Sequence, residues 1–313
     1  MQQPPLLTDA LAALLEGVPR KDLAAAAKAI SDGYRAGASS HAIATPLQAA
    51  AYATARMPAT YAACAAVFAR LAEVMPDFRP RSLLDVGAGT GAASWAAVTA
   101  WPDLQTITML EPNPALRNLA RRLAENGPLA KSEFLSGNLD AEKPKADMVV
   151  ASYVLAELPE DKAAAIARDL WQGTSSALVL IEPGTPQGFA RIRAARAALI
   201  EAGAHVAAPC THDNACPMAE GDWCHFSQRL SRSRDHMLLK DANVPFEDER
   251  YSYAVVTRAK PASGARILAP PLEAKHGLTF KLCDENGLHA QFVASRDKDE
   301  YRRVRKRGWG DLF

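Results

Sequence analysis

The fold of this chain is decided by the stretch Leu83-Leu84-Asp85-Val86-Gly87-Ala88-Gly89-Thr90-Gly91. Its first four residues predict a buried strand, and the glycines that follow predict a tight turn that opens a helix. Glycine suits such a turn because the backbone must bend sharply and let a ligand approach without a Cβ in the way. The pattern is also compatible with a purely structural turn, so the flanking sequence must decide between the two interpretations.

Short apolar runs alternate with amphipathic stretches on the C-terminal side of this turn. Strands are predicted at 83–86, 106–110, 133–135, 148–151 and 177–181, and helices near 91–101, 113–126, 160–172 and 187–202. This alternation predicts right-handed βαβ units and a parallel sheet covered by helices on both faces. We therefore expect an α/β fold with a Rossmann-like sheet.

The remaining sequence divides into regions of different composition. Residues 1–76 are rich in Ala and Leu at helical spacing and predict a helical region, and residues 77–204 form the predicted core. The composition of residues 205–245 shifts to Cys, His, Pro, Asp and Trp without clear periodicity. This predicts a loop-rich insert that needs a cross-link such as a bound metal to hold it in place. Residues 246–313 predict the last core strand at 251–257, further strands near 279–282 and 289–294, and a basic helix.

Composition and charge exclude several classes of protein. The chain has 313 residues, of which 49% are hydrophobic and 23% charged, so intrinsic disorder is excluded as a global description. A formal net charge of +1 gives no global nucleic-acid signature, and no window has the 18 consecutive apolar residues of a membrane helix. Asp9 and Glu16 precede the first base, Arg20, which argues against a secretory signal or presequence. We expect a cytoplasmic protein with no membrane partner.

The residues after the predicted strands complete a candidate cofactor site. Glu111 ends the second strand, where doubly wound folds hold a ribose diol, and Asn138 and Leu139 follow the third strand, where they could cover an adenine edge. The predicted cofactor-binding residues are Asp85, Gly87, Ala88, Gly89, Gly91, Glu111, Asn138, Leu139 and Ser152.

This order of strand, glycine loop, helix, strand and acid resembles the class I S-adenosylmethionine-dependent methyltransferases, whose first motif is Asp-x-Gly-x-Gly-x-Gly. Dinucleotide-binding enzymes are the competing interpretation. The beginning Asp85-Val86-Gly87 and the acid in Glu111-Pro112-Asn113 favour the methyltransferase. The resemblance implies that S-adenosylmethionine is the cofactor.

The sequence predicts no particular catalytic residue. Methyl transfer depends mainly on positioning the two reactants and on excluding water, so catalytic residues are hard to recognise in a sequence. Residues 151–158 contain neither the Asn/Asp-Pro-Pro-Tyr/Phe box of amino-methylating enzymes nor the Pro-Cys of C5 pyrimidine methyltransferases. Cys64 lies in a predicted helix, where a buried structural thiol is the expected role.

Four other cysteines form a candidate metal site. Cys210, Cys216 and Cys224 lie close together in the insert, and Cys283 follows in a predicted strand. Zinc sites typically use C-x₂₋₄-C pairs, which this chain lacks, whereas the wider spacing and the Cys-Pro pair suit an iron-sulfur cluster better. Zinc stays open as the alternative, with His212 and His225 as candidate mixed ligands or hydrogen-bond donors.

Two basic groups are candidates for a local phosphate-binding surface. Residues 296–307 contain seven Lys or Arg and three acids with Tyr301 between them, and Arg229, Arg232 and Arg234 follow the third cysteine of the insert. Solvated helix faces also account for such runs. Because both groups lie beside the candidate metal site, a local phosphate-binding surface is a second hypothesis.

At the level of the whole chain, the sequence resembles the family of the mitochondrial ribosomal small-subunit protein twenty-two and methyltransferase-like protein seventeen. The cysteine region is the most specific part of the resemblance. The matching stretches include Arg56-Met57-Pro58-Ala59-Thr60-Tyr61, Ala151-Ser152-Tyr153, Glu182-Pro183-Gly184-Thr185-Pro186, Ala208-Pro209-Cys210, Ala215-Cys216-Pro217, Asp222-Trp223-Cys224-His225-Phe226, Lys281-Leu282-Cys283 and Arg307-Gly308-Trp309-Gly310-Asp311.

This resemblance implies a methyltransferase-like protein that holds a 4Fe-4S cluster with Cys210, Cys216, Cys224 and Cys283. It also implies binding to the small ribosomal subunit and its rRNA during assembly, and a bacterial member of the family. We expect S-adenosylmethionine-dependent rRNA methylation coupled to assembly. The alternative is a non-catalytic assembly factor that uses the cluster structurally or as an iron or redox sensor. The acceptor atom and the oligomeric state stay open.

Overall fold

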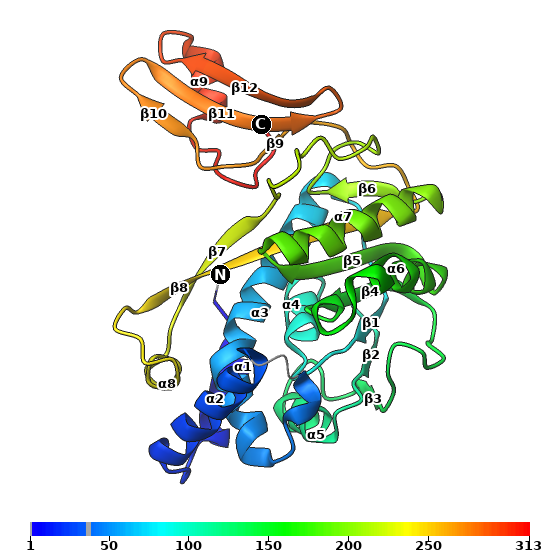
Figure 1. Ribbon diagram of the computed structural model, residues 1–313, viewed down its shortest axis with the longest axis vertical. Coiled ribbons are helices and arrows are strands. Elements are labelled where there is room, and N and C mark those ends of the chain that lie inside the picture. Colours follow the sequence, from blue (N-terminus) through cyan, green and yellow to red (C-terminus); the bar gives the residue numbers. More distant parts are fainter. Residues whose placement is uncertain (1, 36–38) are drawn as a thin grey trace.

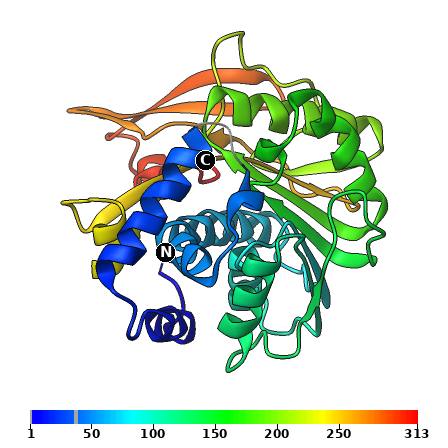
Figure 2. The ribbon, with the colours of Figure 1, turned by 60° about the horizontal axis from the view of Figure 1, so that its bottom comes forward.

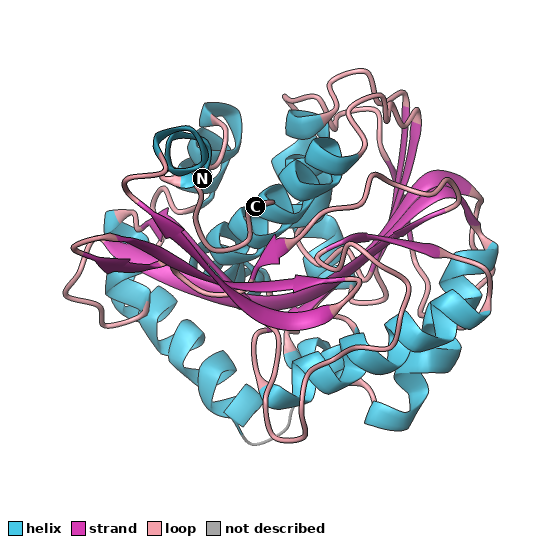
Figure 3. Ribbon diagram, turned by 90° about the horizontal axis from the view of Figure 1, so that it is seen from above, coloured by secondary structure: helices cyan, strands magenta, loops and turns pink. Residues whose placement is uncertain are grey.

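A central sheet crosses the molecule and carries helices on both faces (Figure 3). The computed structural model describes residues 2–35 and 39–313. The strands of the sheet are β1 (Ser82–Val86), β2 (Thr106–Leu110), β3 (Glu133–Leu135), β4 (Ala146–Ser152), β5 (Thr174–Pro183), β6 (His205–Ala208), β7 (Phe226–Ser231) and β8 (Phe246–Thr257). The five strands predicted before residue 200 are thereby confirmed.

The strand order is β3-β2-β1-β4-β5-β8-β6, with β7 also paired to β8. The strands from β3 to β5 are parallel, whereas β8 runs antiparallel to β5, β6 and β7. The chain builds outward from β1 to β3 and then returns to place β4 on the other side of β1. This reversal is a topological switch point, and such folds bind ligands beyond the carboxyl ends of the strands at that point.

Alternating burial along the strands separates two apolar layers. Leu83, Val150 and Val179 face the helices α3 (Pro46–Val74), α4 (Ala92–Ala100) and α5 (Pro114–Ala124). Their neighbours Leu84, Val149 and Leu178 face α6 (Ala163–Gln172) and α7 (Pro186–Glu201) on the opposite side. Successive side chains of a strand point to opposite faces, so nearly continuous apolar runs are needed to bury both. The predicted α/β class and its helices are confirmed.

The N-terminal region consists of α1 (Pro5–Leu14), α2 (Arg20–Arg35), the short 3₁₀ turn η1 (Ser40–Ala42) and α3. Helix α3 begins with a capping box between Thr45 and Gln48 and has Pro46 in its first turn, where no amide hydrogen is needed. It buries Tyr61 and Phe68 against the sheet side of the core. Figure 2 shows α2, in blue, beside the yellow hairpin of β7, α8 (Arg234–Leu239) and β8.

The interpretation of residues 205–245 as a loop-rich insert without periodicity is wrong outside its middle part. Strand β6 belongs to the central sheet, β7 pairs with the first half of β8, and α8 connects β7 to β8. These short elements depend on pairing with β8, which is longer than predicted and begins at Phe246. Edge strands of this kind are set by tertiary context more than by local pattern. Residues 209–225 are irregular, as expected.

A smaller sheet stands at one end of the molecule (Figure 1). It contains β9 (Arg266–Ile267), β10 (Leu272–Ala274), β11 (Gly277–Asp284) and β12 (Gly287–Ala294), followed by α9 (Lys298–Val304). The basic helix is shorter than predicted, because the chain turns at residues 305–310 and returns to the core. There Asp311 forms a 2.7 Å ion pair with Arg70 of α3. No helix in the described ranges is both long and apolar enough to cross a membrane.

Candidate functional site

A cavity of about 300 Å³ lies at the switch point, beyond the carboxyl ends of β1, β2 and β4. Its walls include most of the residues predicted from the sequence to bind a cofactor. These are Gly87, Gly89, Glu111, Asn138, Leu139 and Ser152. Residues at the carboxyl ends of four strands therefore converge on one space, as the predicted parallel sheet requires.

The glycine loop depends on backbone conformations that other residues rarely adopt. Gly87, Gly89 and Gly91 have φ angles of +66°, +56° and +84°. A Cβ on Gly87 would lie 2.5 Å from Cγ2 of Val154, whereas a Cβ on Gly89 would have no heavy atom within 4 Å. The loop is thus packed closely against the end of β4 at Gly87 and open to the cavity at Gly89.

Glu111 holds the glycine loop in place. Its carboxylate accepts hydrogen bonds from the backbone N–H of Gly89 and of Asn113, each at 2.8 Å. Burial raises the pKa of Glu111, and the two backbone donors partly oppose that effect. A carboxylate has about four lone-pair sites, so two N–H donors leave room for further hydrogen bonds from a ligand.

Three predicted cofactor-binding residues, Asp85, Ala88 and Gly91, are not among the residues that line the cavity. The Asp85 carboxylate is fully buried and accepts hydrogen bonds from the backbone N–H and the hydroxyl of Ser94, at 3.1 and 2.8 Å. Burial raises its pKa to about 6. Asp85 therefore fixes the start of α4, and its link to a cofactor is indirect.

Part of the N-terminal region covers the cavity, which the sequence did not indicate. Ser40, His41 and Tyr52 line it from above the glycine loop. The Asn113 side-chain amide donates to the carbonyls of Ser40 and Ile43, at 2.8 and 2.9 Å. The Ser40 hydroxyl also donates to Glu157, at 2.9 Å. These bonds tie the η1 segment to the rim on both sides.

The end of β4 is occupied by structural contacts. Tyr153 has a φ of +62°, unusual for a non-glycine residue, and its hydroxyl donates to Glu249 at 2.7 Å. The fully buried Glu182 accepts a hydrogen bond from the backbone N–H of Leu155 at 2.8 Å. Burial raises the pKa of Glu182 to about 8. Anchored in this way, the residues after β4 give the cavity a fixed wall.

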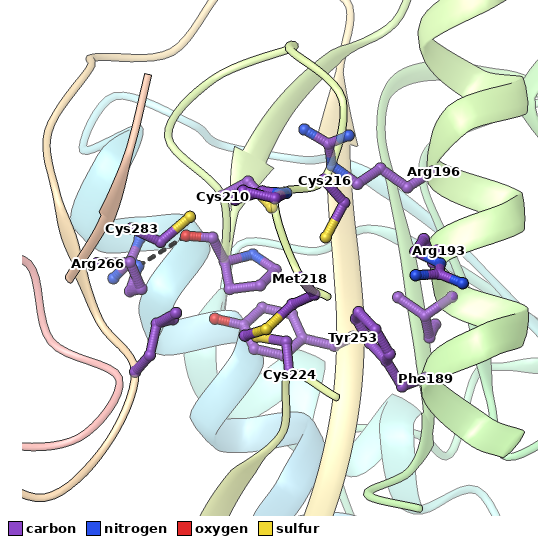
Figure 4. A pocket seen from close by; sticks show the side chains of 14 residues that line it. Phe189, Arg193, Arg196, Cys210, Cys216, Met218, Cys224, Tyr253, Arg266 and Cys283 are labelled. Atoms are coloured by element: carbon purple, nitrogen blue, oxygen red, sulfur yellow. Dashed lines mark hydrogen bonds between the residues drawn. The ribbon is translucent and has the colours of Figure 1, made fainter. Parts of the chain in front are cut away.

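A second, much smaller cavity of about 30 Å³ is lined by four of the chain's cysteines (Figure 4). Cys210, Cys216 and Cys224 come from the irregular segment between β6 and β7, and Cys283 comes from β11 of the smaller sheet. Residues far apart in the sequence are thus brought to one place. The fifth cysteine, Cys64, is fully buried in α3, as the structural interpretation expected.

Of the four cysteines around this cavity, Cys283 is buried and the other three are half-buried. Burial, followed by the neighbouring sulfur atoms, raises the pKa of Cys224 and brings that of Cys283 to about 12. His212 lies beside the cavity, with its Nε2 3.7 Å from Sγ of Cys283. His225 instead stacks on Trp223 and meets the edge of Trp309, with ring centroids 5.4 and 5.2 Å apart.

Among residues 2–35 and 39–313, no three His, Cys, Asp or Glu side chains are gathered tightly enough to hold one metal ion. The cysteines share a cavity, but a Cys-rich metal centre is not shown by this geometry. Two arginines that the sequence did not single out, Arg196 and Arg266, also line the cavity.

Comparison with known proteins identifies the family. Residues 46–313 match the family model described as "Mitochondrial small ribosomal subunit Rsm22". The chain belongs to the Rsm22 family. The resemblance inferred from the cysteine region and the C-terminal motif is thereby confirmed.

Two curated relatives of this Rsm22-family chain are mitochondrial proteins. It is 29% identical over 285 residues to the human "Ribosome assembly protein METTL17, mitochondrial", covering 84% of this chain and 61% of that protein. It is 28% identical over 332 residues to "Rsm22-cox11 tandem protein 2, mitochondrial" of Schizosaccharomyces pombe, covering 86% and 43%. The chain thus spans only about half of the length of these relatives.

Solved structures similar to this chain include methyltransferases. Magnesium protoporphyrin IX methyltransferase from Synechocystis PCC 6803, with bound SAM, has 14% identity and a TM-score of 0.42, over 73% of this chain and 90% of that one. Precorrin-6y C5,15-methyltransferase from Geobacter metallireducens GS-15 has 16% identity and a TM-score of 0.41, over 62% and 85%. The Rossmann-like methyltransferase fold of this chain rests on its own strand order and glycine loop.

Proposed function

We propose that this chain binds S-adenosylmethionine at the switch point and methylates RNA of the small ribosomal subunit during assembly. The observation that carries the proposal is the cavity between the glycine loop, Glu111 and the end of β4. The ribosomal part follows the family description and the name of the human relative, a ribosome assembly protein.

Different residues of the cavity would contact different parts of the cofactor. The open face of Gly89 allows close approach of the methionine part, and Glu111 keeps free lone pairs for the ribose hydroxyls. Asn138 and Leu139 line the same cavity and suit the adenine. When bound, the cofactor supplies an electrophilic methyl group on its sulfonium. The η1 segment and Tyr52 would keep water away from that group.

A pair of arginine variants tests cofactor binding. Gly89→Arg places a long side chain in the cavity, whereas Gly203→Arg places one in open solvent at a similar positive φ of +80°. We expect calorimetry to show at least a tenfold loss of S-adenosylmethionine affinity for Gly89→Arg alone. Equal affinity of both variants, with both folded, would contradict this part of the proposal.

We further propose that Cys210, Cys216, Cys224 and Cys283 hold a 4Fe-4S cluster, with zinc as the alternative metal. A cubane cluster takes one thiolate on each of four irons, so its ligands stand farther apart than those of a single ion. Four thiols around one cavity suit the wider arrangement, even though they do not form a single-ion site. Such a cluster would fasten the irregular segment 209–225 to β11.

Cysteine variants test the cluster. In protein prepared without oxygen, Cys216→Ser should lose most of its iron, acid-labile sulfide and brown colour. Cys64→Ala is the matched control, because Cys64 is buried in α3 away from the cavity. If the parent protein contains stoichiometric zinc and no iron, the cluster proposal is wrong and the zinc alternative holds.

The second candidate is an assembly factor that binds the small subunit without transferring a methyl group. The contacts at the end of β4 favour it, because Tyr153 is engaged with Glu249 and no catalytic box follows the strand. In this role the cluster would be structural or report iron supply. Co-sedimentation with small-subunit precursors, measured beside methyl incorporation, separates the two functions. Binding without incorporation supports the assembly factor.

A further inference from the structure

Two arginines are buried at the cysteine cavity with incomplete hydrogen bonding. The exposed fraction is 4% for Arg196 and 0% for Arg266, and both line the cavity (Figure 4). Nε of Arg196 and Nη2 of Arg266 are buried without a hydrogen-bond partner. A buried guanidinium is costly unless it is paired, so these free donors require an explanation.

The contacts of Arg266 account for only part of its side chain. Its Nε donates to the carbonyl of Pro209 at 2.9 Å, and its Nη1 donates to Gly310 at 3.0 Å and to Glu73 at 3.2 Å. These bonds join the smaller sheet, the C-terminal tail and α3. They leave Nη2 without a partner, on a guanidinium whose Nε contacts Pro209, the residue before Cys210.

Arg196 is less well compensated than Arg266. Its Nη2 donates to the carbonyl of His212 at 2.7 Å. Among the ion pairs of the described residues, none joins Arg196 to a carboxylate within 4 Å. Cys210, Cys216 and Cys283 line the same small cavity, and their sulfur atoms would be anionic thiolates only as ligands of a bound cluster. A positive charge placed here suits an anionic occupant.

We infer that Arg196 and Arg266 donate hydrogen bonds to the sulfur atoms of the bound cluster and offset its negative charge. The inference rests on the proposed cluster. A cubane held by four thiolates is an anion, and reduction adds one further negative charge. Buried donors and positive charges stabilise the reduced form more than the oxidised form, which raises the midpoint potential.

Arg196 allows the cleaner test, because Arg266 also holds the C-terminal tail. The test uses the full chain prepared without oxygen in three variants. Arg196→Gln removes the charge, and Arg196→Lys keeps it. Arg193→Gln is the matched control: Arg193 lies one turn earlier on α7, is exposed, and borders the same cavity with its guanidinium over Phe189. Circular dichroism and thermal unfolding establish that each variant is folded.

The first measurement is the amount of iron and sulfide per chain. The second is a redox titration with dithionite, monitored by the electron paramagnetic resonance signal of the reduced cluster. We expect Arg196→Gln to lower the ratio of reduced to oxidised cluster at least tenfold at a fixed potential. For a one-electron couple this is a shift of about 59 mV to more negative potential. Arg196→Lys should shift less, and Arg193→Gln should match the parent.

The possible results separate this inference from the cluster proposal. An unchanged potential in a cluster-loaded Arg196→Gln protein would overturn the inference and leave the cluster proposal intact. If the folded Arg196→Gln protein retains no cluster, the Arg196→Lys protein decides the matter. A cluster bound by Arg196→Lys supports the role of the positive charge, and no cluster in Arg196→Lys overturns the inference. Absence of iron from the parent protein would instead refute the cluster proposal itself.

Discussion

At the scale of single residues, Glu182 makes the stability of the fold depend on pH. It is fully buried below the end of β4, and burial raises its pKa from 4.5 to about 8. The native state therefore binds a proton that the unfolded state has released, so this group's contribution to stability falls as pH rises from about 4.5 to 8.

Glu182→Gln should remove this dependence. Glutamine keeps the acceptor for the Leu155 N–H and cannot ionise. Relative to the parent, we expect the variant to gain about 1 kcal/mol of unfolding free energy per pH unit between pH 5 and 8. Urea unfolding at pH 5, 6.5 and 8 measures the difference, with exposed Glu125→Gln as control. A pH-independent difference would show that Glu182 does not titrate in this window.

The position of a site residue could be predicted from the sequence where that residue directly follows a predicted strand. Glu111 and the glycine loop follow strands whose ends meet in any parallel sheet, so their convergence could be predicted. The sequence holds a weaker indication that Arg196 is buried, because Arg196 interrupts the apolar stripe of α7 formed by Phe189, Ile192 and Leu199. Arg266 gave none, because nothing in its local sequence marks it as buried.

At the scale of elements, Asn113 connects α5 to the segment that covers the cofactor cavity. Its side-chain oxygen accepts from the N–H groups of Ala115 and Leu116 at the start of α5, and its amide donates to Ser40 and Ile43. One side chain thus caps a helix and positions η1. The two functions can be separated, because aspartate retains the acceptor and lacks the donors.

Asn113→Ala should lose about 1 kcal/mol for the cap and about 0.5–1.5 kcal/mol for each lost amide bond. Asn113→Asp should lose only the bonds to η1. Hydrogen exchange distinguishes them: residues 39–45 should exchange faster in both variants, and the first turn of α5 only in Asn113→Ala. Unchanged exchange in 39–45 would show that other contacts hold the segment.

The covering of the cavity by N-terminal residues could not be predicted from local patterns. Helical spacing predicted α1 to α3 but carries no information about where they dock. Ser40 and His41 reach the cavity because Asn113, seventy residues later, fixes them there. Short strands such as β6 and β7 were missed for a similar reason, since both depend on pairing with β8.

At the scale of the whole molecule, the cysteine cavity lies between the smaller sheet and the segment beside the core, which are also linked by the contacts of Arg266. Cys283 belongs to the smaller sheet, and the other three cysteines belong to the segment beside the core. Removal of the cluster by a chelator should therefore speed hydrogen exchange in β9, β11 and residues 209–225, while β1 to β5 exchange as before. Equal protection with and without iron would mean that the cluster does not fasten the two parts.

The central claim is that one chain combines a cofactor cavity with action on small-subunit RNA. The most direct measurement is transfer of labelled methyl from S-adenosylmethionine to small-subunit particles from a deletion strain, using iron-loaded protein prepared without oxygen. We predict label in the RNA that is lost with Gly89→Arg and retained with Gly203→Arg. No label from iron-loaded protein that still binds the particles would contradict methyl transfer and leave the assembly factor as its function.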